Sequence, residues 1–168
     1  MTNAGAAPRR TIDEPLMNLA LYQPDIAPNV GAMLRLAACL GVSVDLIEPC
    51  GFPVDDRRLR RAGMDYIDHV RLVRHSSWDA FQRDRGPGRL ILLTTAGDCL
   101  FPHLSFRADD TVMVGRESAG VPPEVHAAAD VRLRLPMRHG LRSLNVTLSA
   151  AMVLSEALRQ TDGYAALT

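Results

Sequence analysis

The stretch from Leu135 to Arg159 constrains the fold of this chain more than any other. A short apolar segment ends at Pro136, and a loop with one glycine and two arginines follows it up to Arg142. We expect Ser143 to start a long helix, because serine and asparagine in a first turn satisfy free backbone N–H groups. The helix body is apolar on nearly every face, which predicts that it is buried. Its polar start beside a basic loop fits a ligand site, and the same pattern also fits a capped core helix.

The composition is that of a globular protein with an apolar core. The chain has 168 residues, of which 47% are hydrophobic and 23% charged, and this suits one domain. Apolar runs fall well short of the roughly 20 residues that span a bilayer. Residues 1–15 lack the apolar segment of a secretion signal. We therefore expect a disordered tail at 1–15, one domain at 16–168, no membrane partner and a cytoplasmic location.

Titratable residues narrow the possible functions further. The three cysteines are widely spaced without a C-x-x-C pair, which fits reduced thiols in the cytosol. The five histidines show no metal-ligand spacing, so no metal site is predicted. A net charge of zero argues against indiscriminate polyanion binding. The run from Arg57 to Arg61 is typical of a solvated face. Together with Arg138, His139 and Arg142 it also fits a basic track that binds the phosphates of a nucleic acid.

Strand-like and helix-like segments alternate along the whole chain. Strands are expected at 17–22, 42–47, 70–73, 89–95, 111–114 and 131–135. Helices are expected at 29–40, 55–62, 77–83, 122–129 and from 143 onward. Asn29 is the expected cap of the first helix and Gly41 its stop. This alternation predicts the α/β class, with a mostly parallel sheet flanked by helices.

Three loops in the C-terminal half follow predicted strands, at residues 93–97, 115–120 and 135–143. Open α/β sheets bind ligands at the carboxyl ends of their strands, and glycines let a ligand approach the backbone. The apolar neighbours suit a nucleoside base. A standard dinucleotide site and a P-loop are excluded, because neither glycine signature is present. Each loop alone also fits an ordinary tight turn, but three on successive strands favour a site.

Two further patterns involve single polar residues. Asn29, Gly31 and Arg35 form an N-x-G-x-x-x-R motif over almost two helical turns. Because Gly31 costs a helix about 1 kcal/mol relative to alanine, we expect a close approach there. Glu117 lies inside the second glycine loop. It either holds an ammonium group of a ligand or caps backbone N–H groups, and we favour the structural role.

Together these pieces resemble a known family. N-x-G-x-x-x-R, VGRESAGVP at 114–122 and LPM…RSLNVTLSAAMVL at 135–154 are similar to the three motifs of the SPOUT-class (SpoU/TrmH-type) RNA 2′-O-methyltransferases. The segments LYQPDIAPNVGAMLRLAACLG and IEPCGFPVDDRRLRRAGMDY look like the small single-domain subgroup that methylates the wobble nucleotide of tRNA. The likeness runs from Met17 to Gly163. Ser155 departs from it, because relatives often carry an aromatic residue there, and any role of that aromatic is in doubt here.

The resemblance implies a C-terminal deep trefoil knot, a homodimer in which both subunits contribute to the site, and S-adenosylmethionine as cofactor. It implies that Arg35 is catalytic. A guanidinium is essentially always protonated, so orienting the 2′-hydroxyl or stabilising the alkoxide charge that develops on it is the safer role. The residues expected at the cofactor are Leu93, Thr94, Gly115, Glu117, Gly120, Leu135, Met137, Ser143 and Leu144. Those expected at the RNA are Asn29, Arg138, Arg142 and Asn145.

The function that the resemblance predicts is methylation of the ribose 2′-hydroxyl at the tRNA wobble position. The nucleotide would be a cytidine or a 5-carboxymethylaminomethyluridine in the anticodon stem-loop. One alternative is the same chemistry at another tRNA or rRNA position. Another is a non-catalytic RNA-binding module of the same fold.

Overall fold

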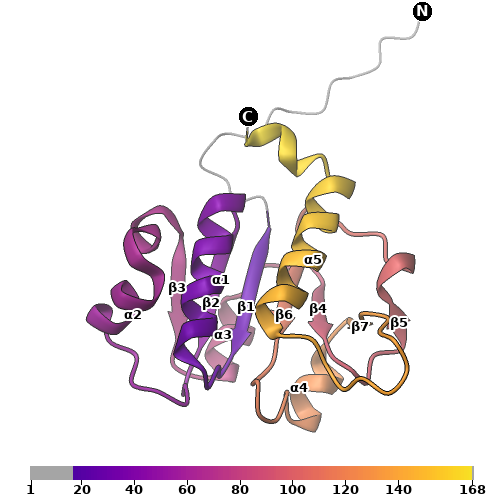
Figure 1. The fold of residues 1–168 in the computed structure, drawn as a ribbon, viewed down its shortest axis with the longest axis horizontal. Helices are drawn as coiled ribbons and strands as arrows, with labels where there is room; N and C mark the ends of the chain where they lie inside the picture. The colour runs from indigo at the N-terminus through magenta and orange to yellow at the C-terminus, as the bar shows by residue number, and fades with distance from the viewer. Residues whose placement is uncertain (1–16, 168) are drawn as a thin grey trace, which may run out of the picture.

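A seven-stranded sheet lies at the centre of the structure (Figure 1). The computed structural model describes residues 17–167, so the predicted tail at 1–15 lies outside the described residues. The strands are β1 (Asn18–Tyr22), β2 (Ser43–Ile47), β3 (Leu72–His75), β4 (Leu90–Leu93), β5 (Cys99–Leu100), β6 (Thr111–Val114) and β7 (Val131–Arg134). Their order is β3-β2-β1-β6-β4-β7-β5, and all neighbouring strands are parallel. The predicted α/β class with a mostly parallel sheet is confirmed.

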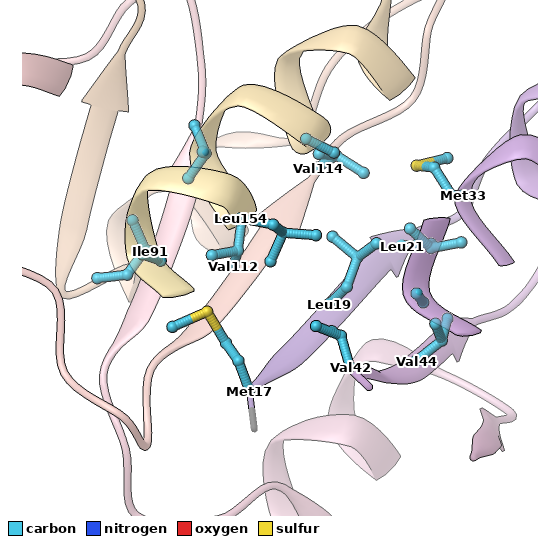
Figure 2. Packing of buried hydrophobic residues seen from close by; sticks show 14 of the residues in the cluster. Met17, Leu19, Leu21, Met33, Val42, Val44, Ile91, Val112, Val114 and Leu154 are labelled. Carbon is cyan, nitrogen blue, oxygen red and sulfur yellow. The ribbon is translucent and has the colours of Figure 1, made fainter. Parts of the chain in front are cut away.

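Helices cover both faces of this sheet (Figure 1). They are α1 (Ala27–Leu40), α2 (Asp56–Gly63), α3 (Trp78–Asp84), α4 (Pro123–Ala128) and α5 (Val146–Gln160), with short 3-10 helices η1 (Met64–His69), η2 (Phe101–His103) and η3 (Gly163–Ala166). Side chains alternate between the two faces along each strand. On β1, Leu19 and Leu21 pack in the cluster with α1 and α5, whereas Ala20 packs on the opposite face with α3 and α4. Figure 2 shows Leu154 of α5 in the first cluster.

The first helix starts earlier than the sequence predicts. Its N-cap is Ile26, which makes no side-chain cap hydrogen bond, and a proline occupies the first turn. Proline is suited to that position because its missing N–H has no partner there. The prediction that Asn29 caps the helix is therefore wrong, and its side chain bonds to a distant loop instead. Gly41 ends the helix with a φ of 64°, as predicted.

The long C-terminal helix starts later than predicted. Asn145 is its N-cap and accepts hydrogen bonds from the backbone of Thr147 at 2.8 Å and of Leu148 at 3.3 Å. Ser143 therefore belongs to the preceding loop. Within the single chain the expected burial is only partial, because 59% of Leu148 and 47% of Met152 are exposed. One face of α5 packs on the sheet, and an apolar strip of the other face is uncovered.

The remaining differences are at the sheet edges. The weak strand predicted at 70–73 forms at Leu72–His75. The two-residue strand β5 was not predicted, because Cys99–Leu100 is too short for a periodic pattern and forms by pairing with β7. Within residues 17–167, no helix combines the length and apolar character needed to cross a membrane.

Candidate active site

The carboxyl ends of β4, β6 and β7 surround a cavity of about 570 Å³. These three strands are neighbours in the parallel sheet, so the loops that follow them meet at one edge. Ile26 and Asn29 at the start of α1 close one side of the cavity. The three loops selected from sequence therefore form a single site.

Most of the predicted site residues line this cavity. They are Asn29, Leu93, Thr94, Gly115, Glu117, Gly120, Leu135, Met137, Arg142, Ser143, Leu144 and Asn145. Arg35 and Arg138 are exposed and do not line it. The structure thus brings the predicted cofactor residues together, and what each of them binds remains a prediction.

The loop after β6 is a closed backbone turn. The N–H of Arg116 donates to the carbonyl of Gly120, and the N–H of Gly120 donates back, each at 2.9 Å. A Cβ on Gly115 would lie 2.7 Å from the carbonyl carbon of Gly120. The backbone of Gly120 has a φ of 64°. Both positions require glycine, because a side chain would collide with the backbone at one and is strained at the other. The turn presents bare backbone to the cavity.

Glu117 ties this turn to the start of α1. Its Oε2 accepts a hydrogen bond from the N–H of Asp25, and its Oε1 accepts one from Nδ2 of Asn29, both at 3.0 Å. In return, Oδ1 of Asp25 accepts from the N–H of Glu117 at 3.1 Å, and the Ser118 hydroxyl donates to Oδ2. These contacts support the structural role that we favoured for Glu117, since both of its oxygens are used by protein donors.

The charge of Asp25 is part of the same arrangement. Hydrogen bonding with Glu117, and then with Ser118, lowers the pKa of Asp25 to about 2. Donors that bond to a carboxylate favour its charged form. Asp25 and Ser118 were not among the predicted site residues. The sequence signal for Asp25 was only an acidic residue in a proline-bracketed loop.

Asn145 joins the third loop to the same network. Its Nδ2 donates to Oδ1 of Asn29 at 3.3 Å, while its Oδ1 caps α5. The hydroxyl of Thr147 donates to the carbonyl of Asn29 at 3.4 Å. Asn29 therefore contacts both Glu117 and the start of α5, and it holds three segments of the cavity wall in one arrangement.

Arg35 lies on the outer side of α1. Its guanidinium carbon is 4.9 Å from the centre of the Tyr66 ring in η1. Arg35 therefore lies outside the cavity of its own chain. Sequence reasoning missed Tyr66, because nothing in its local pattern indicates a contact with a residue on another helix.

The shape and lining of the cavity suit an adenosyl group. Its volume falls in the range of small-molecule pockets, roughly 300–1,000 Å³. Leu93, Leu135 and Leu144 give it apolar walls, while the Gly115–Gly120 turn offers backbone at close range. In the part of the chain that the structure describes, no group of three or more His, Cys, Asp or Glu side chains could hold a metal ion.

Fold and cavity together define an α/β protein that takes a nucleoside-like ligand at the carboxyl ends of adjacent parallel strands. More specifically, the chain belongs to the SpoU rRNA Methylase family, whose model matches residues 16–155. A relative from Beijerinckia indica is named tRNA (cytidine(34)-2′-O)-methyltransferase. It is 57% identical over 150 residues, which cover 88% of this chain and 93% of that protein.

Solved structures agree with this assignment. One described as "Structural insights into the 2-OH methylation of C/U34 on tRNA" has a TM-score of 0.81 and 38% identity, covering 88% of this chain and 97% of that one. A SpoU methyltransferase from Streptomyces viridochromogenes in complex with AdoMet has a TM-score of 0.75 and 25% identity. In that comparison 91% of this chain and 59% of that chain are covered.

Proposed function

We propose that this protein transfers a methyl group from S-adenosylmethionine to the ribose 2′-hydroxyl of the wobble nucleotide of tRNA. The observation that carries the proposal is the cavity between the loops after β4, β6 and β7, which is lined by residues from each of the three sequence motifs of the family. Relatives of nearly the same length, at up to 57% identity, are named for this reaction on cytidine 34. We assign the activity to one domain at residues 16–168, acting in the cytoplasm.

The cavity residues divide by what they offer a ligand. The cofactor supplies an electrophilic methyl group when it is bound. The Gly115–Gly120 turn would hold its adenosyl part through backbone groups. Further cofactor contacts are proposed for Leu93, Thr94, Leu135, Met137, Ser143 and Leu144. Asn29, Arg142 and Asn145, at the rim, and the exposed Arg138 would contact the RNA.

Arg35 is proposed to stabilise the charge that develops on the 2′-oxygen as its proton leaves. Because Arg35 does not line the cavity of its own protomer, we propose a homodimer in which it serves the partner's cavity. Four apolar side chains that are each more than 40% exposed support this: Ile26 and Leu144, which line the cavity, and Leu148 and Met152 of α5. Exposed apolar side chains of this kind fit a protein–protein interface.

Mixed dimers test whether the site is shared. An Arg35→Ala chain is combined with a Gly115→Val chain, which disrupts the turn. If each site uses the cavity of one chain and Arg35 of the other, one site in each mixed dimer is intact. Random pairing should then restore about a quarter of the wild-type activity. Subunit exchange between the two variants is verified separately. If the exchanged mixture is inactive, Arg35 and the cavity act within the same chain, and the shared site is contradicted.

We also propose that the C-terminal segment forms a deep trefoil knot. The path of the chain supports this. It leaves β7, runs along the cavity through residues 135–145, and returns to pack α5 against β6 and α1, two strands away in the sheet. Pulling the ends of a knotted chain in a single-molecule experiment should leave it shorter than the roughly 3.5 Å per residue of a fully extended chain.

The proposed reaction is tested by incubation with methyl-labelled S-adenosylmethionine and tRNA from a strain that lacks the gene. Label at a nuclease-resistant wobble position is the expected result. Label at another tRNA or rRNA nucleotide would support the same methyl transfer at a different position. Cofactor and RNA binding without any transfer would indicate a binding module. Arg35→Ala should abolish transfer and leave cofactor affinity within a few-fold.

A further inference from the structure

Arg35 of α1 lies over the ring of Tyr66 in η1. The guanidinium carbon lies 4.9 Å from the ring centre, which is within the range of a cation–π contact. Among the side chains that the structure describes, Arg35 has no hydrogen-bond or ion-pair partner, and its N–H groups face none of the described acceptors. By contrast, Arg89 donates two hydrogen bonds to Asp110. The donors of Arg35 are thus available to a ligand.

Arg116 makes a second arginine–aromatic contact. It lies over the ring of Tyr22, with 5.6 Å between the guanidinium carbon and the ring centre. However, its Nη2 donates to the side chain of Gln23. Arg116 therefore uses a donor to hold the protein together, whereas the contact of Arg35 with its ring is not accompanied by such a hydrogen bond among the described residues.

A cation–π contact without a hydrogen bond has a specific consequence for Arg35. An exposed arginine has many rotamers, and ordering its side chain costs conformational entropy. The ring contact limits these rotamers, while the N–H donors of the guanidinium have no acceptor among the described residues. We infer that Tyr66 is a positioning residue, which holds Arg35 in the orientation that meets the ribose oxygen. This inference rests on the proposed function.

The ring is anchored independently of Arg35. Ile67, next to Tyr66, packs against the hydrophobic core. Asp68, one residue further along η1, forms a salt bridge with Arg60 of α2, with 2.9 Å between Nη1 and Oδ1. The segment that carries Tyr66 is therefore fixed to the core and to α2, so the ring can act as a platform for a flexible side chain.

Two substitutions separate the ring from the rest of the side chain. Tyr66→Phe keeps the aromatic face, and we expect its kcat to stay within about twofold of the wild type. Tyr66→Leu removes the face, and kcat for methyl transfer to tRNA should fall roughly 3- to 30-fold. The dissociation constant of S-adenosylhomocysteine and the KM for tRNA should change less than twofold, because neither ligand's binding site includes Tyr66. His69→Gln, a change of an exposed residue at the end of the same 3-10 helix, is the matched control and should leave kcat unchanged.

A double-mutant cycle distinguishes positioning from a structural role. With Arg35→Lys as background, Tyr66→Leu should lower the remaining kcat much less than it does in the wild type, because lysine lacks the guanidinium that Tyr66 orients. If Tyr66→Leu lowers the melting temperature strongly, Tyr66→Met replaces it, since the flexible methionine side chain fills the same space. Equal losses in both backgrounds, or an unchanged kcat in Tyr66→Leu, would overturn the inference while the wild type remains active. A wild type inactive on every tRNA would instead overturn the proposed function, and this inference with it.

Discussion

The side-chain amide of Asn29 donates to Oε1 of Glu117 at 3.0 Å, although the two residues are 88 positions apart in the chain. This hydrogen bond connects the N-x-G-x-x-x-R motif on α1 to the glycine turn after β6. Through Nδ2 of Asn145, which donates to Asn29 at 3.3 Å, it also reaches the loop that precedes α5. The three sequence motifs are thus parts of one hydrogen-bonded wall.

Glu117→Ala should weaken both the fold and the cofactor site. The substitution leaves the N–H of Asp25 and the amide of Asn29 without their acceptor, and unpaired donors cost about 1–3 kcal/mol. We expect that loss in the free energy of unfolding measured with denaturant. Calorimetry should show weaker binding of S-adenosylhomocysteine. The control is Glu124→Gln, a change of an exposed residue in α4. An alanine variant indistinguishable from this control would show that the network does not support the site.

Gly115→Ala should open the turn after β6. The added Cβ would lie 2.7 Å from the backbone of Gly120, so the turn must shift, at a cost of about 1–3 kcal/mol. Cofactor affinity should fall at least about tenfold, measured by titration with S-adenosylhomocysteine. Gly86→Ala is the matched control, because a Cβ there meets no atom within 4 Å. Unchanged affinity in Gly115→Ala would mean that the cofactor does not use this turn.

Two substitutions at Asn145 separate its cap from its contact with Asn29. Asn145→Ala removes the N-cap acceptor of α5 and should cost about 1 kcal/mol of unfolding free energy. Asn145→Asp keeps the acceptor for Thr147 and Leu148 but loses the donor to Asn29. We expect this variant to have near-wild-type stability but slower methyl transfer. Full activity in the aspartate variant would limit Asn145 to capping.

Asp25 gives the stability a specific dependence on pH. Its folded pKa of about 2 lies below the ordinary value of about 3.9. The charged form therefore stabilises the fold above about pH 4, and this contribution is lost as the pH falls toward about 2. Unfolding free energies measured across this interval should fall more steeply for the wild type than for Asp25→Asn. Parallel curves would show that Asp25 is not held as a carboxylate in the folded state.

The sequence predicted the architecture because its apolar runs and turn residues alternate in a regular order. It also predicted that three loops share one site, since carboxyl ends of parallel strands meet at one edge. It could not show what depends on contacts between distant segments. Asn29 was expected to cap its own helix, and the structure uses its side chain on Glu117 instead. The ring under Arg35 comes from Tyr66 on another element, and β5 forms only by pairing with β7.

A crystal structure of the protein with S-adenosylhomocysteine tests the central claim, that the loops after β4, β6 and β7 hold the cofactor, most directly. We predict the adenosyl group inside the 570 Å³ cavity, with backbone hydrogen bonds from the turn after β6. We also predict that the guanidinium of Arg35 from the second protomer faces the same cavity. An empty cavity, or a ligand bound elsewhere on the protein, would contradict the account.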